Sequence, residues 1–557
     1  MEERIRDAVG EALAAAGAAG AAFTLERPTE AAHGDYATNA AMVAAKALGK
    51  NPRELAEELA TKMKELLGDA VEKVEVAGPG FINITLAAGE VVASTAEAAA
   101  KGEDWGKGKA EAGKRVMIEY TQPNPFKEMH IGHVMGNTIG ESVARLTQNE
   151  GATIVRANYQ GDVGPHVAKA LWGLQKAGIT EPTTATEISE AYVAGNRAYE
   201  DDPEAKGEID AINRAVYQAL GDPLTLTEGG ALMELWRKGR DVSLAAFEEV
   251  YKVLGTKFDY YFFESETAPI GLKVVRDGLA RGVFEESEGA VVYKGEKRGL
   301  HTRVFITSQG TPTYEAKDMG LAFLKEERWP SDKSVVTTAQ EQASYFAVIL
   351  EALKELAPLL GGKTQHVPYG FMKLTTGKMS SREGNVITAA SLIEDVVKRA
   401  SEKNADPLIA EQVAVGAIKY MILRQAPGAD IVFEPEKSLS LEGDSGPYLQ
   451  YALVRAVKIL SYESEEAGGK EEPQEPYAIE RLILHYPEVA ARAAKLLVPN
   501  ILTSYLTELA GAWNSFYASE QVLGSPEEEY KMRVARAFAN TMANGLALLG
   551  IPAPERM

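Results

Sequence analysis

The sequence predicts an α/β protein with a parallel sheet at its centre, a small α+β domain before the sheet and an all-helical domain after it. Three patterns support this fold class. A strand-like run from Val116, a helical segment ending at Gly151 and the strand-like run ATIVRANY form a βαβ unit. Before about residue 105 helical and strand-like patterns are mixed, and beyond about residue 440 the chain is helical almost to its end.

Residues 1–108 are predicted to form the α+β domain. Alanine-rich helical segments such as NPRELAEELATKMKELLG precede two strand-like segments, VEKVEVAG and GFINITL, which are separated by a Gly-Pro-Gly turn. The stretch AAKGEDWGKGKAEAGKR is rich in glycine and charge, which is typical of a linker. The first domain boundary is therefore placed in this stretch.

Residues 109–437 are predicted to carry the parallel sheet, with a helical insertion at about residues 170–260. A βαβ unit implies that ligands bind at the carboxyl ends of the strands. Further strand-like segments, GAVVYKG, TRVFITS, SVVTTA and VPYGFMKL, are expected to complete the sheet. Residues 438–557 show helical apolar spacing, as in GPYLQYALVRAVKILSY, and are predicted to form a helix bundle.

The composition limits the possible partners. The chain has 557 residues, no cysteine and seven scattered histidines, so disulfides, a cysteine-based zinc site and other metal-ligand clusters are not expected. Its acidic, weakly apolar start is unlike a signal peptide, and no apolar run approaches a membrane span, so we expect a cytoplasmic protein without membrane contact. A net charge of -21 is mild evidence against nucleic acid, although local basic faces can still bind RNA.

The first candidate site motif is HIGH, at the start of the central helical segment. His130 and His133 project from one face of the first helical turn, beside unpaired backbone N–H groups that attract phosphate. Gly132 has no side chain, so an adenine ring or ribose can pack against the backbone there. The pattern favours a nucleoside triphosphate; the alternative is that the two histidines only cap or pack the helix end.

The second candidate motif is KMSSREGN. Lys378 and Arg382 flank two hydroxyls between Gly377 and Gly384, which suits a mobile basic loop that binds pyrophosphate. Alone, the motif is weak evidence, and a solvated loop carrying two cations is its ordinary explanation. The order strand, HIGH helix, insertion, distal strand and KMSSR loop predicts that both motifs contact one ATP molecule.

Longer segments resemble a known family. They are EYTQPNPFKEMHIGH, RANYQGDVG, FDYYFFESE, GTPTYEAKD, KMSSREGN, GDSGPYLQYALVR and a terminal PERM. The chain resembles class I aminoacyl-tRNA synthetases, and arginyl-tRNA synthetase over nearly its whole length, with HGDYATNAAM and AGPGFIN similar to that family's N-terminal additional domain. The resemblance implies a Rossmann-like catalytic domain, an N-terminal domain that contacts the tRNA D-loop and a C-terminal anticodon-binding domain.

The resemblance also implies the reaction. The carboxylate of L-arginine attacks the α-phosphate of ATP to give arginyl adenylate, and the terminal adenosine of tRNA(Arg) then takes the arginyl group through its 2′ hydroxyl. Expected ligands are ATP with Mg²⁺, L-arginine and tRNA(Arg), without zinc, and a monomer is expected. Neither step needs a protein nucleophile, so catalysis is mainly alignment and stabilisation of phosphate charge.

The ATP site implied by the resemblance departs from the family at one position. The ATP-binding residues would be His130, Gly132, His133, Lys378, Met379 and Ser380. Ser381 replaces the second lysine of the family's KMSKS motif. Family members that lack this lysine usually carry one just before HIGH, where Lys127 stands. We therefore expect Lys127 and Lys378 to share the transition-state charge, with Arg382 in support.

A guanidinium group is planar and permanently charged, so its site needs carboxylates and amide oxygens placed for fork-like pairing. By resemblance, the arginine-binding residues are Glu119, Asn124, Tyr314, Asp318 and Gln342. Glu119 could instead form a surface ion pair, and Tyr314 and Asp318 could simply pack and cap a helix. The family's histidine near Gln342 is Tyr345 in this sequence.

Aromatic side chains are the usual platforms for unpaired tRNA bases. Tyr448 and Tyr451, at i and i+3, and the final residue Met557 match the family's anticodon contacts, whereas Phe81 and Asn83 match its D-loop contacts. The alternatives are core packing for the tyrosines and Phe81, and a frayed terminus for Met557.

Three other functions agree less well with the sequence. A class I synthetase for glutamate, glutamine or lysine shares the two motifs but not the PN-x-x-K-x-x-HIGH spacing, the GPYLQYA helix or the first domain. A small-molecule nucleotidyltransferase would not need the helical C-terminal domain. A non-catalytic synthetase-like binding protein would not need intact HIGH and lysine residues.

Overall fold

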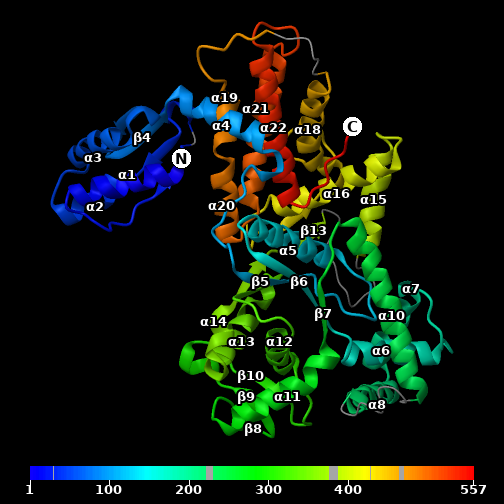
Figure 1. The fold of residues 1–557 in the computed structure, drawn as a ribbon. Coiled ribbons are helices and arrows are strands. Elements are labelled where there is room, and N and C mark those ends of the chain that lie inside the picture. The colour runs from blue at the N-terminus through cyan, green and yellow to red at the C-terminus, as the bar shows by residue number, and fades with distance from the viewer. Residues whose placement is uncertain (29, 221–229, 375–386, 427, 463–468) are drawn as a thin grey trace. The chain divides into compact units, whose positions relative to one another are not determined.

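The computed structural model describes residues 1–28, 30–220, 230–374, 387–426, 428–462 and 469–557 (Figure 1). The chain forms two compact units. Unit 1 contains Met1–Gly106, Ala452–Ala490 and Leu506–Asn544, and unit 2 contains Lys107–Tyr451, Ala491–Tyr505 and Gly545–Met557. Helices α18 (Gly446–Leu460), α20 (Tyr486–Leu496), α21 (Asn500–Ser519) and α22 (Glu528–Leu548) contribute residues to both units.

Unit 1 begins with a four-stranded antiparallel sheet and helices that pack on it. The strands lie in the order β1-β2-β4-β3. The elements are α1 (Glu2–Ala15), β1 (Leu25–Glu26), β2 (Tyr36–Thr38), α2 (Ala40–Leu48), α3 (Pro52–Leu67), β3 (Val71–Ala77), β4 (Phe81–Leu86) and α4 (Ala88–Lys101), with α19 (Ala478–Leu484) among the later helices. The predicted α+β character of this region is confirmed.

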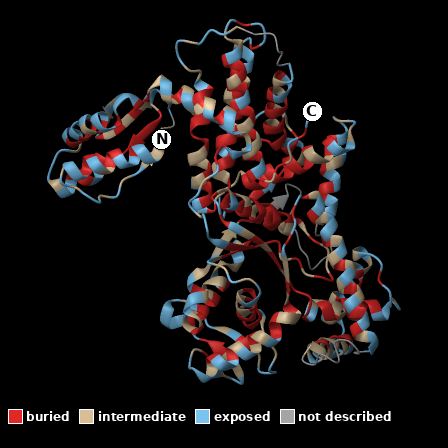
Figure 2. Ribbon diagram, viewed as in Figure 1, coloured by how far each residue is buried: buried red, intermediate tan, exposed pale blue. Residues whose placement is uncertain are grey.

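Unit 2 contains a five-stranded parallel sheet in the order β12-β11-β5-β6-β7. The strands are β5 (Arg115–Glu119), β6 (Thr153–Gln160), β7 (Tyr260–Phe263), β11 (Lys333–Ala339) and β12 (Thr364–Tyr369). Figure 2 shows buried residues throughout its central strands, as expected for parallel strands that are covered on both faces. The predicted parallel sheet is confirmed.

The helices of unit 2 surround this sheet and also fill the stretch after β6. They are α5 (Ile131–Asn149), α6 (Pro165–Lys176), α7 (Ala185–Asp201), α8 (Pro203–Leu220), α10 (Gly230–Val253), α11 (Glu264–Ala280), α12 (Tyr314–Arg328), α13 (Ala343–Leu356), α14 (Pro358–Lys363), α15 (Ala389–Ser401), α16 (Pro407–Leu423) and α17 (Pro435–Ser438). Two short strands, β13 (Met372–Leu374) and β14 (Ile431–Phe433), pair in parallel beside them.

One part of the strand prediction is wrong. GAVVYKG and TRVFITS do not join the parallel sheet, because β9 (Ala290–Tyr293) and β10 (Arg303–Ile306) form a separate antiparallel sheet with β8 (Glu285–Ser287). The turn between β8 and β9 has two residues with positive φ, Glu288 and Gly289, which is the geometry of a tight hairpin. The local hairpin therefore fixes the pairing of β8 and β9 independently of the main sheet.

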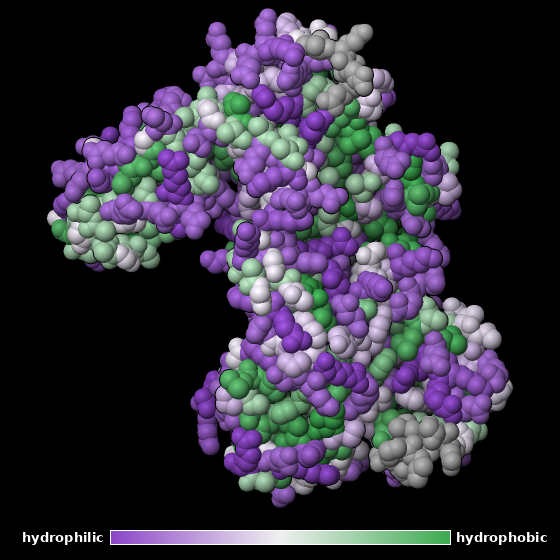
Figure 3. Space-filling view, in the orientation of Figure 1, coloured by the Kyte–Doolittle hydropathy of each residue, from purple (hydrophilic) through white to green (hydrophobic). Residues whose placement is uncertain are grey.

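None of the helices in the described ranges is long and apolar enough to cross a membrane. Hydrophilic residues cover most of the face drawn in Figure 3.

Helix α5 lies close against the sheet because glycine faces it. Gly140 lies on α5, and a methyl group there would come within 2.2 Å of Cβ and Cγ of Tyr120. The far end of α5 is anchored by polar contacts: Ser142 Oγ donates to the carbonyl of Leu548 at 3.0 Å and Arg145 to the carbonyl of Ala547 at 2.9 Å. The start of α5, which carries the HIGH motif, is thus held relative to the sheet.

We predict that Gly140→Ala destabilises the protein, because the added methyl group would overlap atoms close to the backbone of β5. Overpacking of this kind typically costs about 1–3 kcal/mol, which thermal unfolding would report as a lower Tm. Gly207→Ala is the matched control, since nothing lies within 4 Å of the added methyl group in α8. This control should raise stability by about 0.5–1 kcal/mol, and an equal Tm change in the two variants would contradict the prediction.

Candidate active site

A strained loop connects β5 to α5. Thr121, Gln122 and Phe126 have φ values of 79°, 51° and 69°, which is rare for residues other than glycine. The loop is held by contacts on both sides: the backbone N–H of Phe126 donates to Ser243 Oγ at 3.0 Å, and Asn137 Nδ2 donates to Thr121 Oγ1 at 3.1 Å. Backbone strain of this kind persists where the surroundings fix the conformation, and it is frequent at functional sites.

The two histidines of HIGH lie together at the start of α5. His130 is the N-cap residue, and its Nδ1 accepts the N–H of Gly132 at 3.1 Å. The Nδ1 of His133 accepts the N–H of His130 at 3.0 Å, and the two rings stack with centroids 3.8 Å apart. Because each Nδ1 is an acceptor, the proton of each neutral ring lies on Nε2.

Both imidazoles are neutral near pH 7. Burial lowers the pKa of His130 to about 4, and the nearby charge of Lys127 adds to this effect. Burial, followed by His130 and Lys127, also lowers the pKa of His133. Each ring can therefore cap the helix through Nδ1 and still donate an Nε2–H to a ligand, so the capping and ligand interpretations do not exclude each other.

A cavity of about 620 Å³ opens beside these histidines at the carboxyl ends of the parallel strands. It is lined by the following predicted site residues: Glu119, Asn124, His130, Gly132, His133, Tyr314, Asp318 and Gln342. The structure thus places the HIGH motif and the predicted amino-acid pocket in one cavity.

Two sets of predicted residues are not among those that line this cavity. The Nζ of Lys127 lies 4.4 Å from the ring centroid of Tyr192 on α7, and burial lowers the pKa of Lys127. The predicted loop residues Lys378, Met379, Ser380 and Arg382 lie outside the described residues. Phe371 and Met372, which precede that loop, line the cavity.

Five carboxylates line the cavity, and three of them, Glu119, Glu264 and Asp318, lie close enough for their charges to interact. Glu119 is buried, forms an ion pair with Lys325 and accepts a hydrogen bond from Gln122 Nε2 at 2.8 Å. The surface ion pair considered for Glu119 is thus a buried one.

The second carboxylate is also paired with a lysine of α12. Glu264 pairs with Lys317 at 2.5 Å. Burial acts to lower the pKa of Lys317, but the charge and hydrogen bond of Glu264 together with Tyr217 and Tyr314 raise it, so the lysine stays charged. Glu264, Lys317 and Lys325 were not predicted as site residues.

Asp318 differs from the other two carboxylates. Its Oδ2 accepts the hydroxyl of Tyr345 at 2.6 Å, and no ion pair to it is found among the described residues. Burial raises the pKa of Asp318 to about 7; the Tyr345 hydrogen bond lowers it, and the charges of Glu119 and Glu264 raise it. The acidic end of the cavity therefore holds one carboxylate whose charge is not balanced, which suits a ligand group with a single positive charge.

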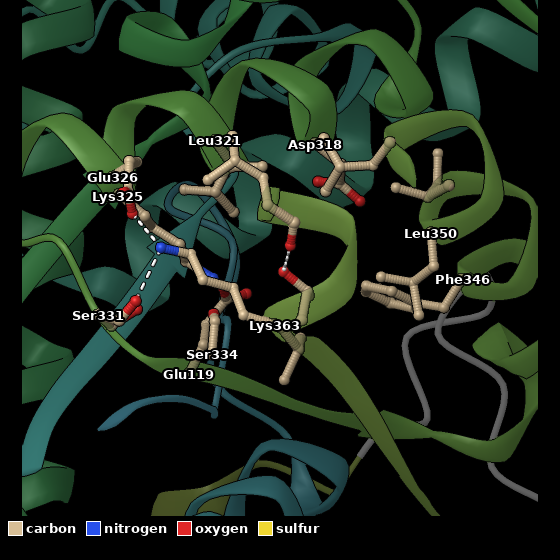
Figure 4. Close-up of a pocket in the computed structure, with 16 residues that line it drawn as sticks. Glu119, Asp318, Leu321, Lys325, Glu326, Ser331, Ser334, Phe346, Leu350 and Lys363 are labelled. Carbon is tan, nitrogen blue, oxygen red and sulfur yellow. Dashed lines mark hydrogen bonds and ion pairs between the residues drawn. The ribbon is translucent and has the colours of Figure 1, made fainter. Parts of the chain in front are cut away.

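The back of this acidic end is apolar. A smaller cavity of about 50 Å³ shares Glu119, Asp318 and Phe346 with the large one. Figure 4 shows Phe346 and Leu350 on one side of it, and Lys363 between Glu326 and Ser331 on the other. Apolar walls exclude water, so an unpaired charge here would be costly.

The predicted tRNA-contact residues lie on half-exposed faces. In β4, Phe81 and Asn83 are half-buried, whereas Ile82 and Ile84 alternate with them and enter the core. The residues of this strand that pack in the core are therefore Ile82 and Ile84, and not Phe81.

The predicted anticodon residues lie in unit 2. Tyr448 and Tyr451 on α18 are half-buried, and Met557 packs against the core of unit 2. Between the tyrosines, Gln450 Nε2 donates to the carbonyl of Pro552 at 2.7 Å, which ties the C-terminal segment to α18. Met557 is therefore packed against the protein, and the alternative of a frayed terminus is wrong.

Three known families match the chain. The family described as "tRNA synthetases class I (R), catalytic domain" matches residues 97–434, "Arginyl tRNA synthetase N terminal domain" matches residues 3–86, and "DALR anticodon binding domain" matches residues 449–557. Together with the parallel sheet and the HIGH helix, these matches define the chain as a class I aminoacyl-tRNA synthetase.

Individual relatives narrow this class. The arginine–tRNA ligase of Treponema pallidum subsp. pallidum is 31% identical over 571 residues, covering 97% of this chain and 95% of the relative. The arginine–tRNA ligase of Bdellovibrio bacteriovorus is 32% identical, covering 96% and 94%. The solved arginyl-tRNA synthetase of Thermus thermophilus has a TM-score of 0.82 at 26% identity over 99% of both chains. The chain belongs to the arginyl-tRNA synthetase family, and the family prediction is confirmed.

We predict that Lys325→Met strongly destabilises the protein, because it leaves the buried Glu119 carboxylate without its cation. Breaking a buried pair in this way typically costs about 3–5 kcal/mol. Urea unfolding of the single variant and of the Glu119→Gln, Lys325→Met double variant would measure the effect. The double variant should regain most of the lost stability, and a single variant as stable as the wild type would contradict the buried pair.

Proposed function

We propose that the cavity activates L-arginine with ATP and passes the arginyl group to the 2′ hydroxyl of the terminal adenosine of tRNA(Arg). The observation that carries this proposal is that one cavity contains both hydrogen-bond donors suited to phosphate and a carboxylate suited to a cation. Neutral imidazole donors line the cavity at a helix start, and Asp318, a half-buried carboxylate without a cationic partner among the described residues, lines it elsewhere.

At the phosphate end, the groups of this chain act by donating hydrogen bonds. The Nε2–H groups of His130 and His133 would bind phosphate oxygens, whereas the backbone N–H groups of Ile131, Gly132 and His133 already have acceptors within the protein. Gly132 allows this arrangement, since a methyl group there would come within 2.9 Å of the His130 ring. The amino-acid carboxylate and the α-phosphate would meet between this end and the acidic end.

Mg²⁺ would reach the cavity bound to the triphosphate and neutralise phosphate charge there. Among the described residues, no group of three or more Asp, Glu or His side chains is placed to hold a metal ion. Two of the cavity's carboxylates are already paired with lysines. The donor set therefore fits a metal that is carried mainly by phosphate oxygens and water, as is usual for Mg²⁺.

At the acidic end, Asp318 would pair with the guanidinium of arginine. Lys317 and Lys325 neutralise Glu264 and Glu119, so one negative charge is available for one positive charge. Asn124, Tyr314 and Gln342 line the same cavity and would complete the amino-acid site, as the resemblance implies. The side chain of glutamate would be repelled by the unbalanced charge, which disfavours a glutamate-activating enzyme.

Lys127 would join the phosphate end during the reaction, in place of the second lysine of KMSKS, with Lys378 and Arg382 as partners. Its present position over Tyr192 means that its ammonium group would have to move toward the phosphates.

For tRNA, we propose contacts of Phe81 and Asn83 with the D-loop and of Tyr448, Tyr451 and Met557 with the anticodon. The half-buried aromatic side chains of Phe81, Tyr448 and Tyr451 support this assignment. The corresponding domains would be residues 1–108, 109–437 and 438–557. A monomeric state and a cytoplasmic location stay predictions from the sequence.

The substrate is tested by pyrophosphate exchange with each amino acid, in the presence and absence of tRNA. We predict exchange with arginine alone, and only when tRNA(Arg) is present. Lysine and citrulline should be rejected by roughly 10⁴ to 10⁵, because they leave buried polar groups of the site unpaired. Exchange supported by glutamate or lysine would overturn the proposal.

Lys127→Ala should lower the kcat of exchange by roughly 10² to 10³, the usual effect of removing one transition-state donor. The KM for arginine should change less than about threefold, because Lys127 lies outside the acidic end. Lys169→Ala is the matched control, since Lys169 lies 4.3 Å from the ring centroid of Tyr199 in the same kind of contact. Unchanged adenylate formation in the Lys127 variant would refute its assignment.

A further inference from the structure

Tyr345, where the family carries a histidine, forms a hydrogen bond to Asp318 in the cavity. It lies in the first turn of α13, is 9% exposed and lines the cavity with its carboxylate partner. Its hydroxyl donates to Asp318 Oδ2 at 2.6 Å. A hydrogen bond of this length to an ionised carboxylate is charge-assisted and among the stronger kinds in proteins.

The ring of Tyr345 is fixed on several sides, so its hydroxyl is held in place. Phe346 meets the ring edge to face, with centroids 5.4 Å apart. The guanidinium carbon of Arg303 lies 5.1 Å from the ring centroid, and Arg303 is itself bonded to Glu315 at 3.1 Å. The ring also belongs to the buried apolar cluster around α13. The donor is therefore preorganised toward Asp318.

We propose that Tyr345 is a positioning residue for amino-acid recognition, whose hydroxyl fixes the Asp318 carboxylate and favours its ionised form without cancelling its charge. This inference rests on the proposed function, in which Asp318 pairs with the arginine side chain. A lysine in the same place would hold Asp318 equally well but would neutralise it, as Lys325 neutralises Glu119. A neutral hydroxyl leaves the negative charge available to the incoming guanidinium.

Other groups act on Asp318 from every neighbouring element. Glu119 on β5 and Glu264 on α11 disfavour its charged form, and Lys325 on α12 favours it. Tyr159 on β6 is a further, half-buried neighbour, and removal from water raises its pKa well above the usual range, so it stays neutral. The Tyr345 hydrogen bond is thus the largest of the influences that lower the pKa of Asp318 against the effect of burial.

The two oxygens of Asp318 have different roles, one toward Tyr345 and the other toward the proposed guanidinium. Oδ2 takes the Tyr345 hydroxyl, while Oδ1 has no protein hydrogen bond among the described residues. A carboxylate has about four lone-pair sites, so Oδ1 and the remaining site on Oδ2 can accept the two parallel N–H groups of a guanidinium. The fixed hydroxyl would set the plane of this fork.

The test compares Tyr345→Phe with the wild type in tRNA-dependent pyrophosphate exchange from pH 6.5 to 9. Without the hydroxyl, Asp318 should ionise about one pH unit higher, because a donor to its charged form is lost. The KM for arginine should rise about tenfold at pH 7, and the difference should narrow to about threefold or less by pH 9. The kcat and the KM for ATP should change less than about twofold.

The matched control is Tyr293→Phe. Tyr293 belongs to the same apolar cluster, and its hydroxyl donates to Glu355 at 2.9 Å, outside the cavity. This variant loses the same kind of hydrogen bond and should leave the KM for arginine unchanged at every pH.

Two results would overturn the inference. One is a KM for arginine that is unchanged in Tyr345→Phe. The other is a rise that is the same at all pH values, since that would mean a packing role only. A wild type that shows no arginine-dependent exchange would instead refute the proposed function, so the two failures are distinguishable.

Discussion

The carboxylate of Asp318 is half-buried and faces the cavity, and no cation pairs with it in the described part of the chain. A charge that is partly removed from water is costly without a partner, so the surroundings of this one are arranged around it. Two lysines of α12 balance the neighbouring carboxylates, and a neutral tyrosine holds Asp318 itself. The acidic end is thereby incomplete by one positive charge, which in the proposed function an arginine side chain would supply.

The other end of the cavity depends on the opposite arrangement, in which buried imidazoles carry no charge. Their Nδ1 atoms are used by the first turn of α5, so their remaining N–H groups face outward as donors. Helix α5 holds these donors because Gly140 lets it lie against Tyr120 and because Ser142 and Arg145 anchor its far end. The strained loop before α5 links the two ends, since it carries Gln122, which bonds Glu119.

The sequence predicted the elements whose signals are local. The βαβ unit followed from periodicity and glycine positions, and HIGH followed from its spacing at a helix start. The separate sheet of β8, β9 and β10 was missed because periodicity indicates a strand but not its pairing partner. Glu264, Lys317 and Lys325 were missed because their function depends on ion pairs between distant segments; Glu264 and Lys317 are 53 residues apart. The position of Lys127 over Tyr192 was not predictable for the same reason.

The most direct test of the unbalanced carboxylate is proton release on arginine binding, measured by calorimetry in buffers of different ionisation enthalpy. With a pKa of about 7, Asp318 is about half protonated at pH 7, and a bound guanidinium would force it to ionise. The account predicts release of about half a proton per arginine at pH 7, falling to almost none at pH 9 and absent in Asp318→Asn. Binding of arginine at pH 7 with no proton release would contradict it.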